Sequence, residues 1–515
     1  MVRQRDATVS GLRTNLAANI AGTGSLALVQ LACVPFYIRF LGIAAYGLVG
    51  FFMTLQATLR IFDFGLSPTM NREMARYSVQ AGRPDEMRDF VRTVEIGYWA
   101  LGATVGAVVC AAAPLLVTHW INVSSMPPHV AQQAVMIMGG VIAVHWPLSL
   151  YQSALTGLQR QVDLNAVRIA AAVLSGGGAL LILWLVSPTI IAFFAWQMAV
   201  CLVEVLLLAA CLWSRLPPAT RPVRVNPVLV KPVLGFAGGM GGIALAGMIL
   251  TQMDKLILSG LLPLEMFGYY TLAGMAANSL HLFIGPVFAV TFPRLCALVA
   301  SADHEMLGKV YHDGTQLMSV LVFPLALTIG FFASDVLRLW TGNALLAQQA
   351  APILVFLIAG TAINGAMFLP YALQIAHGWT KLALAVSVGM CLAMVPAVYF
   401  MGTHYGAAGA AAVWTALNVL NLLIAFPLTH RRLRHNDAWE WIGKDVALPL
   451  MAAAAVTLSA RCLLVLPSTK SAAVTVLALI LAATMVVAAA SASRVRHWVV
   501  DLYSGIPARR GHGQA

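Results

Sequence analysis

The sequence predicts an all-α polytopic membrane protein, and three observations support this fold class. Of its 515 residues, 60% are hydrophobic, and only 10% are charged, whereas soluble domains carry about 25% charged residues. The mean hydropathy is +0.83. Apolar stretches of about 20 residues, the length at which a helix crosses a bilayer, recur along the whole chain. We therefore expect a multi-pass bundle of transmembrane helices.

Fourteen apolar stretches are long enough to span the membrane. In chain order they lie near 16–38, 45–70, 96–118, 130–150, 166–186, 189–212, 233–261, 265–292, 316–334, 350–373, 381–401, 406–428, 444–466 and 471–491. The first six predict an N-terminal lobe, the next six a C-terminal lobe, and the last two an appended pair. The corresponding ranges are 1–215 for the N-terminal lobe, 216–232 for a cytoplasmic linker, 233–430 for the C-terminal lobe, and 431–515 for helices 13 and 14 with a basic tail.

The distribution of positive charge predicts the topology. The formal net charge is +12, and all but six of the 31 Lys and Arg residues fall on one side of the fourteen predicted helices. The six exceptions are Arg39, Arg338, Arg461 and Lys470 at the other side, and Arg60 and Lys255 within helices. Positive residues accumulate in cytoplasmic loops. We therefore expect both termini in the cytoplasm and read the basic charge as a topology signal, not as a nucleic-acid site.

Several chemistries lack their sequence patterns. The seven cysteines include no CxxC pair and no His/Cys cluster at metal spacing, and the chain has no GxxxxGK[ST] phosphate loop. The longest outer loops, about 119–129 and 335–350, are too short to hold the acceptor and carboxylates of a membrane glycosyltransferase or polymerase. We expect a transporter without cofactor or metal rather than an enzyme; a scaffold for a biosynthetic complex stays an alternative.

An internal repeat relates the two lobes. A shift of about 221 residues brings Leu41 and Tyr46-Gly47 onto Leu262 and Phe267-Gly268. Six helices preserve orientation, so the repeat is parallel, with an axis along the membrane normal. The repeat predicts two pseudo-twofold six-helix lobes with a cavity between them that opens alternately to either side.

Short motifs in a fixed order resemble a known transporter family. They include Pro35-Phe-Tyr-Ile-Arg39, Tyr46-Gly47, Asp63-Phe-Gly65-Leu66, Arg72-Glu73-Met-Ala-Arg76, Leu155-Thr-Gly157-Leu-Gln159-Arg160, Gln252-Met-Asp254-Lys255 and Leu373-Gln-Ile-Ala-His377-Gly378. Over nearly the whole chain this order is similar to the polysaccharide-transport branch (Wzx-type flippases) of the multidrug/oligosaccharidyl-lipid/polysaccharide (MOP) exporter superfamily. The resemblance implies a MATE-like (MOP) fold. Helices 13 and 14 match, in number, the lipid II flippases of the same superfamily.

The resemblance also implies a function. We expect a flippase that moves a polyprenyl-diphosphate-linked oligosaccharide across the bacterial inner membrane by alternating access, for surface polysaccharide biosynthesis. The expected partners are this lipid-linked glycan, membrane lipid, and a polysaccharide polymerase or chain-length machinery. Two alternatives stay open, namely a lipid II flippase and a cation-coupled drug exporter of the same superfamily.

Four basic residues are candidates for binding the diphosphate and glycan. Arg60 lies inside an apolar stretch, where a charge is expected to face the bundle interior or an aqueous cavity. It either recognises the head group, because guanidinium matches phosphate, or pairs with Asp63 at i,i+3. The 221-residue shift places Arg60 onto His281. Lys255 is a third candidate, and Arg39 is either an exit site or an interface anchor.

Three acidic residues are candidates for ion coupling. Glu204 lies in predicted helix 6 without a charge partner within one turn, so it is either an ion-binding carboxyl or a neutral hydrogen-bonded group. Asp63 is the rival coupling residue. Asp254 matches the family pattern, although packing between lobes is an equal alternative.

Overall fold

The computed structural model describes residues 24–26, 28–79, 83–123, 126–218, 220–231, 234–434 and 437–496; in α9 it describes the side chains of Leu245 and residues 247–261. The predicted basic residues of the two termini, Arg3, Arg5, Arg13, Arg509 and Arg510, lie outside this range, as does the beginning of the first predicted helix. No β-strand occurs among the described residues, which contain one isolated bridge between Asn122 and Pro263. The predicted all-helical fold class is confirmed.

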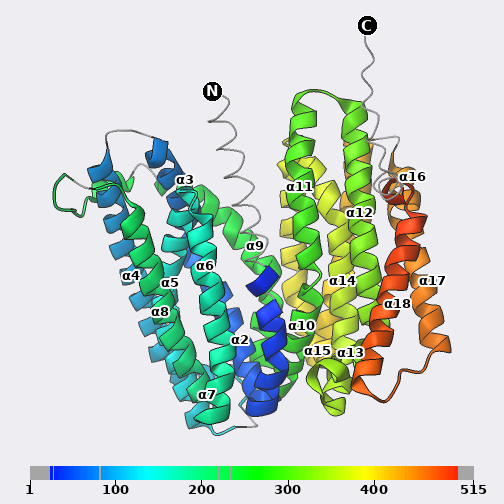
Figure 1. Ribbon diagram of the computed structural model, residues 1–515, viewed down its shortest axis with the longest axis horizontal. Coiled ribbons are helices and arrows are strands. Elements are labelled where there is room, and N and C mark those ends of the chain that lie inside the picture. The colour runs from blue at the N-terminus through cyan, green and yellow to red at the C-terminus, as the bar shows by residue number, and fades with distance from the viewer. Residues whose placement is uncertain are drawn as a thin grey trace. The chain divides into compact units, whose positions relative to one another are not determined.

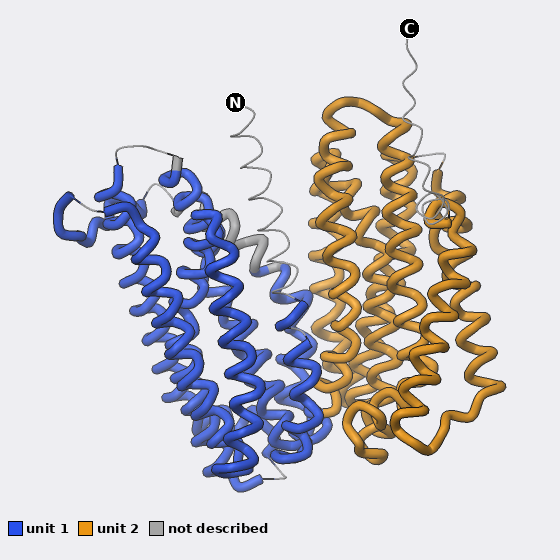
Figure 2. The backbone as a smooth tube through the Cα atoms, in the orientation of Figure 1, with its two compact units in different colours: residues 1–268 blue, residues 269–515 orange. Residues whose placement is uncertain are grey.

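The chain divides into two compact units, Met1–Gly268 and Tyr269–Ala515 (Figure 2). Unit 1 contains the span Gly24–Leu41, α2 (Ile43–Leu59), η1 (Arg60–Asp63), α3 (Leu66–Val79), α4 (Pro84–Leu115), η2 (Leu116–Trp120), α5 (Pro128–Gly157), α6 (Gln161–Val173), η3 (Leu174–Gly178), α7 (Ala179–Leu185), α8 (Ile190–Arg215), η4 (Pro227–Leu229) and α9 (Leu234–Leu261). In this unit α4, α5 and α8 run side by side (Figure 1). The predicted domain ranges stay a prediction.

Unit 2 follows from the middle of α10 (Leu264–Asn278). It contains α11 (His281–Ala300), α12 (His304–Phe331), α13 (Ala333–Thr341), α14 (Ala344–Ala376), α15 (Thr380–Leu433), α16 (Ala438–Glu440), η6 (Trp441–Ala447), α17 (Leu448–Leu463) and α18 (Lys470–Ser491). Its centre is the packing of α12 and α14, which are the most buried spans of this unit.

Twelve helices among the described residues are long and apolar enough to cross a membrane. Two places account for the difference from the fourteen predicted spans. The helix α9 has 28 residues but is not among the twelve. The helix α15 has 54 residues and contains Gly406 with φ 63° and ψ −151°, which separates two helical halves. Glycine tolerates this positive φ because it has no Cβ. The number fourteen stays a prediction.

Two helices that were predicted as continuous are broken. The stretch 45–70 divides into α2, the 3-10 turn η1 and α3. The stretch 265–292 divides into α10 and α11, with Ser279 and Leu280 between them. Apolar periodicity does not reveal a break when the residues on both sides are apolar. The breaks include or adjoin Arg60 and His281, which correspond under the 221-residue shift.

The same shift describes a reciprocal helix contact within unit 1. A Cβ on Gly47 would lie 2.2 Å from the carbonyl oxygen of Leu264, and a Cβ on Gly268 would lie 2.5 Å from that of Ile43. Ile43 and Gly47 correspond to Leu264 and Gly268 at the predicted 221-residue shift. Each contact therefore repeats the other, as a twofold relation requires. Small residues permit such close approach of helix backbones.

The last two helices are attached to unit 2 by polar contacts. The buried carboxylate of Asp445 accepts a hydrogen bond from Gln316 of α12 at 2.8 Å and contacts Nδ1 of His312. At the other end of α17, Arg461 pairs with Asp335 of α13 at 3.1 Å. Buried charges require such partners because an unpaired charge in a low-dielectric interior is costly. The pair α17 and α18 is therefore an integral part of unit 2.

The reciprocal contact predicts that a glycine-to-alanine change here lowers the stability of the protein, which is the opposite of the usual effect in a helix. Alanine normally stabilises a helix by about 0.5–1 kcal/mol relative to glycine. Gly47→Ala and Gly268→Ala are expected to lower the free energy of unfolding by about 1–3 kcal/mol, because their Cβ atoms overlap a backbone oxygen. The measurement is the apparent melting temperature of purified protein by size-exclusion chromatography after heating.

Gly389→Ala is the matched control, because Gly389 lies in α15 and a Cβ there meets nothing within 4 Å. Equal melting temperatures for Gly47→Ala, Gly268→Ala and this control would contradict the close crossing.

Candidate functional site

A break between α2 and α3 exposes the charged segment that the sequence singles out. η1 runs over Arg60–Asp63 and is followed by Phe64 (φ 47°) and Gly65 (φ 76°), both in the left-handed region. A left-handed conformation costs a non-glycine residue roughly 1–2 kcal/mol, so the surroundings must hold Phe64 in place. α3 begins at the next residue, Leu66.

The side chain of Asp63 stabilises the break between α2 and α3. Its Oδ2 accepts the backbone N–H of Ser67 at 3.0 Å, and its Oδ1 accepts the Ser67 hydroxyl at 2.8 Å. An aspartate that binds a free N–H in the first turn of a helix stabilises that helix. The hydroxyl of Tyr98 in α4, a buried residue, donates to the same Oδ1 at 2.6 Å. Asp63 thus fixes both the start of α3 and its attachment to α4.

The structure does not support the alternative of a salt bridge between Arg60 and Asp63. None of the ion pairs among the described residues joins Arg60 to Asp63, and the two do not share a continuous α-helix. Instead, the Asp63 carboxylate accepts hydrogen bonds from Ser67 and Tyr98.

Arg60 is exposed on the broken segment, beside two exposed aromatic rings. Phe62 is 39% and Phe64 55% exposed, and their ring centroids are 6.0 Å apart in an edge-to-face arrangement. A guanidinium can bind phosphate oxygens in a bidentate manner, and aromatic faces offer apolar contact to a sugar ring. The segment therefore places a guanidinium and two exposed aromatic rings within five residues.

Glu95 of α4 is a buried carboxylate that the sequence analysis missed. Its Oε1 accepts the hydroxyl of Tyr151 at 2.7 Å and Nε1 of Trp213 at 3.2 Å, and its Oε2 pairs with Arg92 at 2.8 Å. The predicted third helix begins at residue 96, which left Glu95 outside the membrane. α4 begins at Pro84. The i,i+3 spacing of Arg92 and Glu95 is the sequence signal that would have moved the predicted start of this helix to before residue 92.

Lys255 and Asp254 of α9 lie together. The Lys255 ammonium contacts the carboxylate of Asp254 at 3.1 Å and donates to the carbonyl of Thr251 at 2.8 Å. Both side chains are half-buried. Adjacent helical residues point about 100° apart, but the lysine stem is long enough to bring its charge back to the aspartate. The structure thus joins a basic candidate to an acidic one.

The other candidates are separate from this pair. Glu204 of α8 is half-buried. Arg39 is exposed near the end of the span Gly24–Leu41. His281 is the first residue of α11 in unit 2, with its ring centroid 6.3 Å from that of Phe368. Arg60 belongs to unit 1, so a joint site with His281 stays a prediction.

The comparisons with known proteins concern the family of the chain and its fold. The family described as "Polysaccharide biosynthesis protein" matches residues 12–299. A Shigella flexneri protein described as a candidate O-antigen transporter is 20% identical over 411 residues, which are 80% of this chain and 96% of that protein.

Two solved structures show the same fold. A lipid II flippase, MurJ, in an inward closed conformation superimposes with a TM-score of 0.66 at 14% identity, covering 94% of this chain and 100% of that one. An inward-facing MATE multidrug-resistance transporter of the MOP superfamily gives 0.65 at 16% identity, covering 80% and 95%. The fold class and the resemblance predicted from the sequence are confirmed.

The Asp63 contacts predict the effect of removing one hydroxyl. Tyr98→Phe is expected to lower the free energy of unfolding by about 1–3 kcal/mol, because a hydrogen bond to a charged group is lost. Tyr399→Phe, at a 59% exposed position in α15, is the matched control. The measurement is again the apparent melting temperature, and a Tyr98→Phe protein as stable as the control would refute the anchoring role.

The pairing of Lys255 with Asp254 predicts a non-additive pair of substitutions. Lys255→Met alone removes the ammonium that contacts the half-buried carboxylate of Asp254 and is expected to cost roughly 1–3 kcal/mol of stability. Adding Asp254→Asn removes the charge of that carboxylate and should recover part of the loss. Thermal stability of the two single variants and the double variant measures the coupling; additive effects would exclude a structural pair.

Proposed function

Because the chain belongs to the polysaccharide biosynthesis protein family, we propose that it flips a polyprenyl-diphosphate-linked oligosaccharide across a bacterial inner membrane. At the coarser level the protein is a multi-pass membrane transporter of the MOP type. The O-antigen transporter assignment of its Shigella relative supports a lipid-linked glycan as the substrate class. Both termini are proposed to be cytoplasmic, and a polysaccharide polymerase or chain-length machinery is the proposed partner.

The observation that carries the proposal is the exposed Arg60 in the break after α2. A diphosphate that crosses a low-dielectric region needs a cation, since an isolated charge there is strongly destabilised. We assign Arg60 to the diphosphate, with Phe62 and Phe64 beside it for the first sugars. Lys255, His281 and Arg39 are secondary candidates on the path, the last at its exit.

Transport is proposed to follow alternating access driven by an ion gradient or the membrane potential. Asp63, Glu204 and Asp254 are the candidate coupling residues. Among them Asp63 is the best placed, because it lies three residues from Arg60 and determines the shape of the break. A change in its protonation would act on the segment that presents Arg60.

A lipid II flippase is the second candidate. The observation that favours it is the attachment of α17 and α18 to unit 2, because the predicted helices 13 and 14 match the lipid II flippases in number. The cation-coupled drug exporter is less suited to this site, because an exposed arginine would repel a cationic drug.

Glycan display tests the assignment of Arg60. Arg60→Ala and Arg60→Glu are expected to reduce surface glycan at least tenfold, because a charge-assisted contact to phosphate contributes about 1.5–3 kcal/mol, and Glu adds repulsion. Arg60→Lys should keep part of the activity, since it keeps the charge but not the bidentate geometry. Surface glycan is measured by immunoblot of cells with matched protein levels.

Arg338→Ala is the matched control, because Arg338 is an exposed arginine in α13. Undiminished display in Arg60→Ala cells would refute the assignment of Arg60 to the diphosphate head group. Loss of viability on deletion of the gene, without accumulation of a lipid-linked oligosaccharide, would favour the lipid II candidate.

A further inference from the structure

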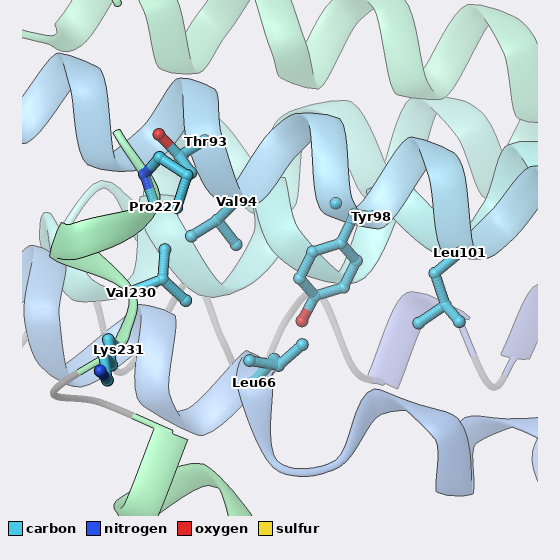
Figure 3. Close-up of a pocket in the computed structure, with 9 residues that line it drawn as sticks. Leu66, Thr93, Val94, Tyr98, Leu101, Pro227, Val230 and Lys231 are labelled. Atoms are coloured by element: carbon cyan, nitrogen blue, oxygen red, sulfur yellow. The ribbon is translucent and has the colours of Figure 1, made fainter. Parts of the chain in front are cut away.

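A groove of ≈ 380 Å³ lies in unit 1 between the start of α3, the middle of α4 and the segment after α8 (Figure 3). Apolar side chains make most of its wall. These are Leu66, Val94, Leu101, Pro227 and Val230. Gly97 of α4 also lines it, and a Cβ built there meets nothing within 4 Å. The groove is therefore open directly above the helix backbone.

The segment 220–231, which we call the linker, forms one wall of this groove because it is fastened to α4. Three side chains of α4, spaced by four residues and thus on one face, hold it. Asp89 accepts the backbone N–H of Arg224 at 2.7 Å, and Thr93 accepts that of Asn226 at 2.8 Å. Asp85 binds the backbone N–H of Thr220 at 2.8 Å. These contacts set Pro227 and Val230 over α4.

The polar groups in the wall are already engaged. The Tyr98 hydroxyl donates to Asp63, and the Thr93 hydroxyl donates to the carbonyl of Asp89 while accepting from Asn226. A water-soluble ligand in this groove would lose its hydrogen bonds to water without replacement, which is unfavourable. The walls therefore suit a hydrocarbon chain.

Among the described residues that line the groove, Lys231 is the charged one. It is exposed, and none of the ion pairs among the described residues includes it. Figure 3 shows its amino group beyond Val230, at the linker end of the groove. An apolar cleft with a cation at its edge is complementary to an amphiphile with an anionic head.

We propose that this groove binds one acyl chain of an anionic phospholipid, with the phosphate on Lys231. At ~30 Å³ for a group of the size of water, the volume holds roughly a dozen methylene-sized groups. That corresponds to most of one fatty-acyl chain and to only a fraction of a polyprenyl tail. The lipid would fasten the linker, and with it the entry to α9, to the predicted cytoplasmic leaflet. Tyr98 lines this groove and also donates to Asp63, but the proposal of a bound lipid does not rest on the proposed transport of glycan.

Lipid titration of the purified full-length protein tests the proposal. Native mass spectrometry in detergent compares palmitoyl-oleoyl phosphatidylglycerol with phosphatidylcholine of the same chains. We expect the wild-type protein to prefer phosphatidylglycerol about fivefold, the factor typical of one lysine near an anionic head group. Lys231→Ala should remove this preference but keep chain binding. Gly97→Leu should remove both, because its side chain fills the groove.

The controls keep the outcome decisive. Gly389→Leu and Lys309→Ala place the same changes at an open helical glycine and at an exposed lysine elsewhere, and both should bind lipid as the wild type does. If Gly97→Leu does not yield a monodisperse protein, Gly97→Ala, which fills the groove partly, should weaken binding by an intermediate factor.

Two results overturn the proposal. One is unchanged phosphatidylglycerol binding in both the Gly97 and the Lys231 variants. The other is displacement of phosphatidylglycerol by undecaprenyl phosphate in a Gly97-dependent manner, which would make the carrier lipid the occupant. Because the readout is lipid bound to the protein, either result can occur whether or not the protein transports a glycan.

Discussion

The carboxylate of Asp63 is the contact on which the candidate site depends. It accepts hydrogen bonds from the backbone and hydroxyl of Ser67 and from the hydroxyl of Tyr98, and so it fixes the first turn of α3 against α4. Without these contacts the left-handed residue Phe64 would have no compensation for its strain. Because the break persists, Arg60 is presented to its surroundings and is not covered by the next helical turn.

A second constraint is the repeat. The reciprocal contacts of Gly47 and Gly268, and the breaks at Arg60 and before His281, all correspond under a shift of 221 residues. A parallel repeat gives both lobes the same orientation in the membrane. Each of the two breaks therefore carries a basic residue, Arg60 or His281. Under the same shift Phe62 corresponds to Phe283, whereas Phe64 corresponds to Gly285.

Charges in this apolar chain are held by partners from distant parts of the sequence. Glu95 is bound by residues of α5 and α8, Asp89 by the linker, and Asp445 by α12. Each arrangement satisfies a carboxylate where water is scarce, as a low-dielectric interior requires. Two of them also attach a peripheral segment to its lobe, namely the linker to α4 and α17 to α12.

The sequence by itself determined the all-helical membrane class, most helix positions and the repeat, and it made the stretch around Arg60 a candidate site. These properties follow from composition and from the length of apolar runs, which are local. It did not determine the helix break or the partners of Asp63, because the hydroxyl of Tyr98 approaches from 35 residues away. Nor did it place Glu95 in the interior.

Only the tertiary structure decided which charges pair. Spacing along one helix suggested Arg60 with Asp63, yet the backbone turns left-handed after Asp63, and hydroxyl groups take its carboxylate instead. Conversely, Lys255 and Asp254 point in different directions as neighbours on a helix, but a flexible stem brings their charges together. Pairing depends on where the charged ends of the side chains meet in space. Spacing along the sequence determines only where the side chains leave the backbone.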